Sequence, residues 1–488
     1  MNTAKKPNIL WICTDQQRFD SLNSSGNKFV ETLNIDRIAQ NGVFFENAYC
    51  NSPTCAPSRA SFLTSRYTRT CRLRENGQKI PQEEKLVTKM LQENGYVCGL
   101  SGKLHLAPNN PMVCKAMEER VDDGYSVFHW SHGAHKGWQN QEYFQWLREK
   151  GKRFKTDHVE GTTEVDYGMD EEDHQTTWCV QKAINFIEAT KEDGYPWEFS
   201  INLFDPHHPF DPPKKYLEKY QKMLEKIPLP NYKQGELEDK PIFQKMDHKA
   251  AYNNHDSENA KYDYDGMSDY EHRLVRAAYW AMIDLIDKQV GRLLECLERT
   301  GQLDNTIIIF MSDHGEMLGD HGIYLKGPYF YEPMVKVPLI ISWPGGNIKK
   351  GLRSKALVEL LDLTPTLLEM LEIPKYSGMQ GKSFLKILTG ESAPGFHRDN
   401  IFCEYLNSMN WHKDPPAYGS MVTDGKFKLV KMHSTGEGEL YDLVKDPTET
   451  NNLWKDESYK DVKLKMLDLL CDRICFTMDP LPVRQAPW

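Results

Sequence analysis

Residues 8–18 read NILWICTDQQR, an apolar run that stops at Asp15 and Gln16. A short apolar run bounded by polar residues is typical of a strand that is buried on both faces of a sheet. Three further runs of this kind occur at residues 96–100, 197–204 and 306–311. They lead into the polar clusters SGKLH, DPHHPF and SDHGEMLGDH. The four runs therefore predict buried strands with polar side chains at their carboxyl ends.

Helical patterns separate the four predicted strands, and they cover residues 34–40, 82–93, 173–191 and 269–300. Alternation of strands and helices predicts an α/β fold, in which helices sandwich a large, mainly parallel sheet. Ligands of such sheets lie in the crevice outside the carboxyl ends of the strands. We therefore expect the four polar clusters to converge on a single active site.

The pattern changes near residues 374–394, which contain several Pro, Gly and Ser residues. Beyond them, residues 421–430 and 439–443 predict short antiparallel strands, and residues 459–475 predict a helix. We expect two domains: residues 1–385 form the α/β catalytic domain, and residues 386–488 form a smaller α+β subdomain.

Two segments fit neither domain pattern. Residues 209–267 have weak periodicity and form either an irregular excursion over the site or a surface loop. The final residues, FTMDPLPVRQAPW, either lie along the protein's own surface or reach another subunit of a homo-oligomer.

Composition excludes several classes of protein. The 488 residues have a formal net charge of −10, with acidic residues dispersed, which argues against a nucleic-acid partner. No apolar run approaches the ~20 residues of a membrane helix. The apolar run near the N-terminus is too short for a signal peptide, so we expect a cytoplasmic protein unless a leader has been removed. The 11 cysteines show no CxxC spacing, as expected in a reducing compartment.

The strand-end clusters contain metal-ligand types. Asp15, Gln16 and Asp313 offer hard oxygen atoms, and His314 adds one imidazole. Oxygen-rich sets favour calcium, magnesium or manganese over a structural zinc ion. An Asp-His pair after one strand is by itself more often a hydrogen-bonded turn. Its expected position beside Asp15 at the same sheet edge favours a metal site.

Cationic and proton-transfer side chains are expected at the same edge: Arg59, Lys103, His105, His207 and Lys326. Such groups suit a tetrahedral oxyanion, because charge-assisted donors stabilise charge on its oxygens. Cys55 lies nearby in the segment TCAPSRAS, residues 54–61. Judged alone it would be a buried small hydrophobe. Ala60 and Ser61 are expected to open a helix, whose N-terminus would add positive potential to an anion pocket.

Over nearly its whole length the chain closely resembles the formylglycine-dependent type I sulfatases of the alkaline phosphatase superfamily. The resemblance rests on segments that occur in order: NILWICTDQQR, CAPSRASFLTSRY, NGYVCGLSGKLHL, DPHHPF, AAYWAMIDLIDKQVGRLLECLERTG, SDHGEMLGDHGIYLKG and ELYDLVKDPTETNNL. The CxPSR sequence followed by a helix is its most specific element.

The resemblance implies that a maturation enzyme oxidises Cys55 to formylglycine. A hydroxyl of the aldehyde hydrate then attacks sulfur and expels the alcohol, and the second hydroxyl assists release of sulfate. It also implies one calcium ion, with Mg²⁺ or Mn²⁺ less expected, bound by Asp15, Gln16, modified Cys55, Asp313 and His314.

Further roles follow from the same resemblance. Arg59 and Lys103 would hold the formylglycine and sulfate oxygens, and His105 would be the base for release of sulfate. His207 and Lys326 would face the leaving oxygen, with His207 as the acid, whereas His208 would be structural.

The substrate is less specified. Gln16 replaces an aspartate that many members of the family carry, a variant that resembles uronate 2-O-sulfatases, choline sulfatases and phosphonate monoester hydrolases. Residues 128–154 are rich in aromatic and basic side chains, which form either a sulfated-saccharide subsite or a helix packed on the core.

We expect a small sulfated carbohydrate as the substrate, such as a 2-O-sulfated uronate derivative, with an aryl or choline sulfate as alternatives. A phosphonate or phosphodiester monoester hydrolase is the rival enzyme. A rival of another class is a catalytically silent, metal-dependent binding protein in which Cys55 is never matured.

Overall fold

The computed structural model describes residues 6–110, 112–134, 140–250, 261–409 and 411–486. Within them a large sheet has nine strands in the order β11-β2-β10-β8-β1-β7-β3-β4, and β9 pairs with β2. Strand β10 is antiparallel to β2 and β8, and the other neighbours along this order are parallel. The strands are β1 Asn8–Thr14, β2 Gly42–Tyr49, β3 Val97–Gly102, β4 Tyr125–Trp130, β7 Trp197–Asn202, β8 Thr306–Ser312, β9 Lys336–Val337, β10 Leu339–Ser342 and β11 Leu352–Glu359.

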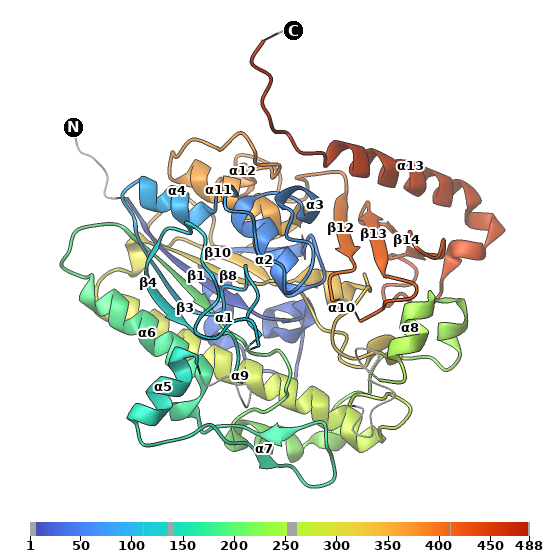
Figure 1. Ribbon diagram of the computed structural model, residues 1–488, viewed down its shortest axis with the longest axis horizontal. Coiled ribbons are helices and arrows are strands. Elements are labelled where there is room, and N and C mark those ends of the chain that lie inside the picture. Colours follow the sequence, from blue (N-terminus) through green and yellow to red (C-terminus); the bar gives the residue numbers. More distant parts are fainter. Residues whose placement is uncertain (1–5, 111, 135–139, 251–260, 410, 487–488) are drawn as a thin grey trace.

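Helices cover both faces of this sheet, which explains why its central strands β1 and β8 are buried along their whole length (Figure 1). One face packs against α1 Leu33–Gln40, α6 Gln175–Ala189 and α9 Asp269–Arg299. The other packs against α2 Cys55–Thr64, α4 Val87–Glu93 and α11 Leu363–Met370. Helix α9 begins at a capping box, in which Ser268 and Glu271 satisfy each other's backbone N–H groups. The α/β fold predicted from the sequence is confirmed.

A four-stranded antiparallel sheet lies beside the large one, and α13 covers it (Figure 1). Its elements are β12 Ile401–Leu406, β13 Tyr418–Thr423, β14 Phe427–Met432, β15 Gly438–Asp442 and α13 Lys460–Phe476. Met466 and Leu470 of α13 pack on Val422 and Leu429 of the sheet. The boundary between domains at residue 385 stays a prediction. Shorter elements are α3 Thr68–Cys71, β5 Asp157–His158, β6 Asp166–Tyr167, α10 Glu332–Val335 and α12 Leu385–Thr389.

The described part of the 209–267 segment is packed into the molecule. It contains α7 Lys214–Gln221 and α8 Ile242–Asp247. The Lys240 ammonium is buried and donates to the Tyr441 hydroxyl at 2.5 Å and the Glu449 carbonyl at 2.9 Å. The Asp247 carboxylate meets the Tyr329 hydroxyl and lies 3.2 Å from His412 Nε2. These polar contacts join the segment to the small sheet and to the loop that carries Lys326.

Several boundaries differ from the sequence expectation. Helix α2 begins at Cys55 rather than at Ala60, so Cys55 is itself in the first helical turn. Helix α4 begins at Val87 rather than near residue 82. The predicted strand at residues 421–430 is two strands, since the chain turns at Gly425 with φ of 83°. Strands β2, β4, β11 and β12 were not predicted, because their sequences mix polar and apolar residues. Strand β10, with the sequence LIIS, was missed because its apolar run is only three residues long.

The aromatic segment at residues 128–154 is mostly packed on the core. Helix α5, Glu142–Glu149, buries Tyr143, Phe144 and Leu147. Residues 135–139 of the suggested saccharide subsite lie outside the described residues.

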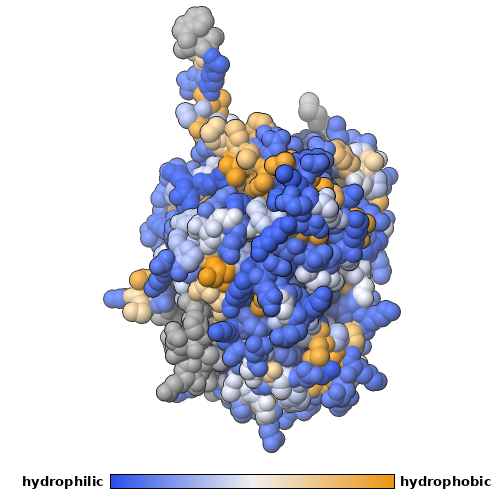
Figure 2. All heavy atoms as spheres, turned by 90° about the vertical axis from the view of Figure 1, so that its right-hand side faces the viewer, coloured by the Kyte–Doolittle hydropathy of each residue, from blue (hydrophilic) through white to orange (hydrophobic). Residues whose placement is uncertain are grey.

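The C-terminal tail leaves the body after α13 (Figures 1 and 2). Asp479 is still tied to Arg66 by an ion pair of 2.9 Å, and Val483 is exposed. Phe476 and Met478 at the base of the tail are 78% and 72% exposed. A homo-oligomer stays a prediction. None of the described helices is long and apolar enough to cross a membrane. All 11 cysteines are free, and Cys471 and Cys475 are the exposed ones.

Candidate active site at the carboxyl edge of the sheet

Four potential metal ligands from distant parts of the sequence meet at one edge of the sheet. Asp15 follows β1, Asp313 and His314 follow β8, and Cys55 begins α2. Their ligand atoms all lie within 4.8 Å of one another, and all four residues are buried. Cys55 Sγ is 3.1 Å from His314 Nε2 and 3.6 Å from Asp15 Oδ1. The predicted convergence of the first and fourth clusters on Cys55 is observed.

The two strand-end loops are held together by hydrogen bonds from backbone N–H groups to side-chain oxygens. Strands β1 and β8 are parallel neighbours, with Thr14 opposite Ser312. The Gln16 N–H donates to Asp313 Oδ1 at 3.1 Å, and the Gln17 N–H donates to Ser312 Oγ at 2.8 Å. These bonds fix the distance between the Asp15 and Asp313 carboxylates.

The donor set fits a divalent cation, because two buried carboxylates and an imidazole face a common point. The surroundings of His314 are anionic. Burial alone would lower its pKa, but Asp313 and Cys55 raise the pKa of this imidazole to about 9. A metal ion would compete with this proton, because a ligating imidazole must be neutral.

The fifth predicted ligand, Gln16, has a left-handed backbone, with φ of 67°. Its side-chain oxygen Oε1 accepts a hydrogen bond from Lys326 Nζ at 2.7 Å, and its Nε2 faces the Glu316 carboxylate. Glu316 also accepts from the Leu318 N–H at 2.8 Å and the Leu325 N–H at 2.5 Å. Glu316 is not among the residues predicted from the sequence, although it directly follows Asp313-His314-Gly315 at the end of β8.

Two of the predicted cations contact the carboxylates. Arg59 Nε lies 2.9 Å from Asp313 Oδ2, and Lys103 Nζ contacts Asp15 Oδ2. Burial would raise the pKa of Asp15, but Lys103, Arg59 and Lys326 together lower it below its usual value. The Asp15 carboxylate is therefore available as an anionic ligand.

Gly102 makes the approach of Lys103 to the site feasible. Its φ is 102°, and a Cβ atom there would lie 2.0 Å from the Asn202 carbonyl oxygen. A side chain at this position is therefore excluded by sterics as well as by backbone conformation. The arrangement lets the chain turn from β3 directly into the site.

Cys55 lies at the positive end of α2, where helix geometry leaves backbone N–H groups without helical partners. The Ala56 N–H donates to Asn76 Oδ1 at 3.1 Å, and the Ser58 hydroxyl donates to the Asp313 carbonyl at 2.6 Å. Burial and Asp15 would raise the pKa of the Cys55 thiol, but Lys103, Lys326 and His314 lower it overall. Asn76 was also missed, since it lies in a loop without a recognisable pattern.

The predicted imidazoles lie around this cluster. His207 Nε2 is 2.5 Å from Lys326 Nζ, and its Nδ1 is 2.5 Å from the His208 carbonyl oxygen. Burial and Lys326 hold the pKa of His207 well below its usual value. Burial and Lys103 do the same for the pKa of His105. Both rings are therefore neutral at neutral pH, and His207 Nε2 accepts a hydrogen bond from Lys326.

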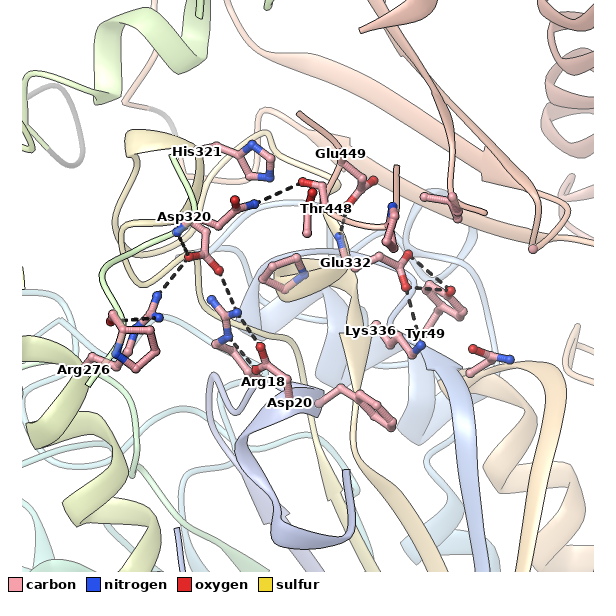
Figure 3. Close-up of a pocket in the computed structure, with 18 of the residues that line it drawn as sticks. Arg18, Asp20, Tyr49, Arg276, Asp320, His321, Glu332, Lys336, Thr448 and Glu449 are labelled. Atoms are coloured by element: carbon pink, nitrogen blue, oxygen red, sulfur yellow. Dashed lines mark hydrogen bonds and ion pairs between the residues drawn. The ribbon is translucent and has the colours of Figure 1, made fainter. Parts of the chain in front are cut away.

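A separate cavity of about 670 Å³ lies behind the strand-end loops (Figure 3). Arg18 and Arg276 both pair with Asp320 there, at 2.7 Å and 2.9 Å. Arg18 Nη1 also donates to the Met317 carbonyl at 3.0 Å, which ties the cavity wall to the loop after β8. None of the predicted catalytic or metal-binding residues lines this cavity.

Comparison with known proteins agrees with this geometry. Residues 7–373 match the sulfatase family, and residues 319–474 match a family described as N-sulphoglucosamine sulphohydrolase, C-terminal. An arylsulfatase from Clostridium perfringens is 32% identical over 474 residues, which cover 93% of this chain and 92% of the relative. An N-acetylglucosamine-6-O-sulfatase from Bacteroides thetaiotaomicron is 26% identical, with 96% and 86% covered.

Among solved structures, a phosphonate monoester hydrolase of Agrobacterium radiobacter is similar, with a TM-score of 0.83 and 25% identity. The match covers 98% of this chain and 97% of that one. The chain thus belongs to the sulfatase family, a group of sulfuric ester hydrolases within the alkaline phosphatase superfamily.

Proposed function

We propose that this enzyme hydrolyses the sulfate monoester of a small sulfated carbohydrate, with Cys55 matured to formylglycine and one calcium ion bound. The observation that carries the proposal is the convergence of Cys55, at a helix N-terminus, with two carboxylates, an imidazole and three cationic side chains. A cysteine kept only for packing would have no need of these charged neighbours, because buried charges are costly.

When present, the divalent cation supplies Lewis-acid chemistry and the formylglycine hydrate at position 55 supplies the nucleophilic hydroxyl. Arg59 and Lys103 bind the sulfate oxygens, since their charge-assisted donors stabilise negative charge there. Lys326 Nζ donates to His207 Nε2, so this pair holds a proton beside the expected leaving oxygen. The neutral His105 ring is able to accept a proton.

The role of Cys55 is tested with protein coexpressed with a formylglycine-generating maturation enzyme. Mass spectrometry of the peptide covering residues 52–66 reports the conversion. Cys55→Ala should abolish hydrolysis of an aryl sulfate and keep the fold, whereas Cys71→Ala, a buried cysteine outside the site, should keep most activity. Equal activity in Cys55→Ala and the parent would exclude Cys55 as the precursor of the nucleophile.

The rival activity, phosphonate or phosphodiester monoester hydrolysis, is supported by the similarity to the Agrobacterium enzyme and by Gln16. Turnover of a sulfate monoester and of a phosphodiester of the same aryl alcohol discriminates between the two. A higher kcat/KM for the phosphodiester than for the sulfate monoester would contradict the proposed function and support the rival activity.

The carbohydrate substrate is supported by the similarity to a relative named for N-acetylglucosamine-6-O-sulfate. Desulfation of a panel of defined sulfated mono- and disaccharides, including 2-O-sulfated uronates, choline sulfate and an aryl sulfate, ranks the candidates. Matured protein that binds calcium and turns over no ester would support the silent binding protein instead.

A further inference from the structure

Glu118 is a buried acid that none of the roles above uses. It lies in the irregular segment between β3 and β4, 13 residues after His105, and its residue is 1% exposed. Its Oε2 accepts from the His105 N–H at 3.0 Å and from Trp130 Nε1 at 2.9 Å, and its Oε1 accepts from the Leu106 N–H at 3.0 Å. All three partners are N–H donors, so the carboxylate is an acceptor in every contact.

The backbone that Glu118 contacts has an unfavourable conformation. His105 has φ of 61°, in the left-handed region, which is unfavourable for a non-glycine residue. Two consecutive N–H groups that donate to one buried carboxylate offset such a cost, because both donors then have a partner. Glu118 therefore stabilises the turn on which the His105 side chain depends.

Little else sets the direction of the His105 ring. Its Nδ1 is buried and has no hydrogen-bond partner among the described residues. The His132 ring packs against it edge-on, with 4.6 Å between ring centroids. The position of the ring is thus determined by the backbone conformation and by packing.

We propose that Glu118 is a positioning residue for catalysis, which acts by holding His105 in the orientation that its proton transfer requires. The proposal rests on the function proposed above. A purely structural role, in which Glu118 only connects the segment to β4 through Trp130, is the alternative that the experiments must exclude.

The kinetic test uses Glu118→Gln, because glutamine keeps the volume but presents an NH₂ group to one of the N–H donors. We expect kcat to fall on the order of tenfold, with KM within about twofold of the parent. His105→Ala and the double variant should have equal kcat, since Glu118 has no effect once the ring is removed. Glu198→Gln, a change at another fully buried acid, is the matched control and should keep the parent kcat.

The second test uses unmatured protein and needs no turnover. Amide hydrogen exchange of a peptide that spans residues 103–106 should be at least about tenfold faster in Glu118→Gln than in the parent, and unchanged in Glu198→Gln. Unchanged exchange, an unchanged kcat, or a further loss in the double variant would each overturn the positioning role. If the matured parent hydrolyses no ester, the proposed function fails, whereas the exchange result still shows whether Glu118 holds the turn.

Discussion

At the scale of single residues, Gln16 shows how neighbours decide what a side chain can do. An amide presents an acceptor on one side and donors on the other. The Glu316 carboxylate faces Nε2, so Oε1 points to Lys326 and the site. The sequence alone predicted an oxygen ligand at position 16, but the direction of that oxygen depends on Glu316 and Lys326, some 300 residues away.

The Lys326–His207 contact predicts how activity depends on the leaving group. His207→Asn and Lys326→Met should each lower kcat/KM more for poor leaving groups than for activated aryl sulfates, because only poor leaving groups need a proton in the transition state. For each variant, kcat/KM is measured with a series of aryl sulfates, and the slope of log kcat/KM against the pKa of the phenol is determined. Equal slopes in the variants and the parent would show that this pair does not act as the general acid.

Asp313 predicts a metal effect that is separable from catalysis. Calcium should raise the Tm of the unmatured parent, because a ligand that binds only the folded state stabilises it. Asp313→Asn should abolish this increment. Asp320→Asn, in the separate cavity, should lower the Tm itself yet keep the calcium increment. The same increment in Asp313→Asn would argue against a metal site at the sheet edge.

At the scale of elements, β7 carries an acid within a strand that is buried along its whole length. Glu198 is fully buried, and its Oε1 accepts from the Ser200 hydroxyl at 2.5 Å. Burial raises its pKa from 4.5 to about 8, although the Ser200 hydrogen bond acts in the other direction. The folded protein therefore carries a neutral Glu198 at neutral pH.

This shift predicts a pH dependence of stability. Between pH 4.5 and 8 the folded state keeps a proton that the unfolded state has lost, so stability decreases as the pH rises through this window. The contribution is about 1.4 kcal/mol per pH unit. Glu198→Gln cannot titrate and should show a flatter dependence, measured as the free energy of unfolding in urea at several pH values. An unchanged slope in the variant would mean that Glu198 is ionised in the fold.

At the scale of the whole molecule, buried ion pairs join the small sheet to the catalytic core. Lys428 of β14 is fully buried, and its ammonium lies 2.8 Å from Glu332 and 2.7 Å from Glu449. Glu332 belongs to α10, at the end of the loop that carries Lys326. The small sheet therefore supports a segment of the active site as well as packing on the core.

Lys428→Met should be strongly destabilising, because it leaves the buried Glu449 carboxylate without its cation, whereas Glu332 keeps Lys336 at 3.7 Å. Loss of one partner of a buried pair costs about 3 kcal/mol or more, which calorimetry would detect as a lower Tm. Lys431→Met on the same strand is the control. Lys431 contacts the exposed Gly436 carbonyl and lies 5.3 Å from the centre of the Trp454 ring, so its loss should change the Tm much less. Similar Tm values for the two variants would contradict a joining role of Lys428.

The sequence by itself determined the strands β1 and β8, the long helix α9 and the identity of the charged residues at the sheet edge. These features are local, because an apolar run or a helical period is decided by neighbouring residues. The same local signals predicted α/β architecture, since parallel strands bring their carboxyl ends to one edge.

Tertiary structure alone decided which groups support the site. Glu118 accepts a hydrogen bond from the backbone N–H of His105, and Glu316 orients Gln16. Asn76 accepts a hydrogen bond from the N–H that follows Cys55 in α2. A buried polar group needs a partner but does not specify where along the chain that partner lies. Such pairings follow from the packing of distant segments, and no periodicity or spacing in the sequence predicts them.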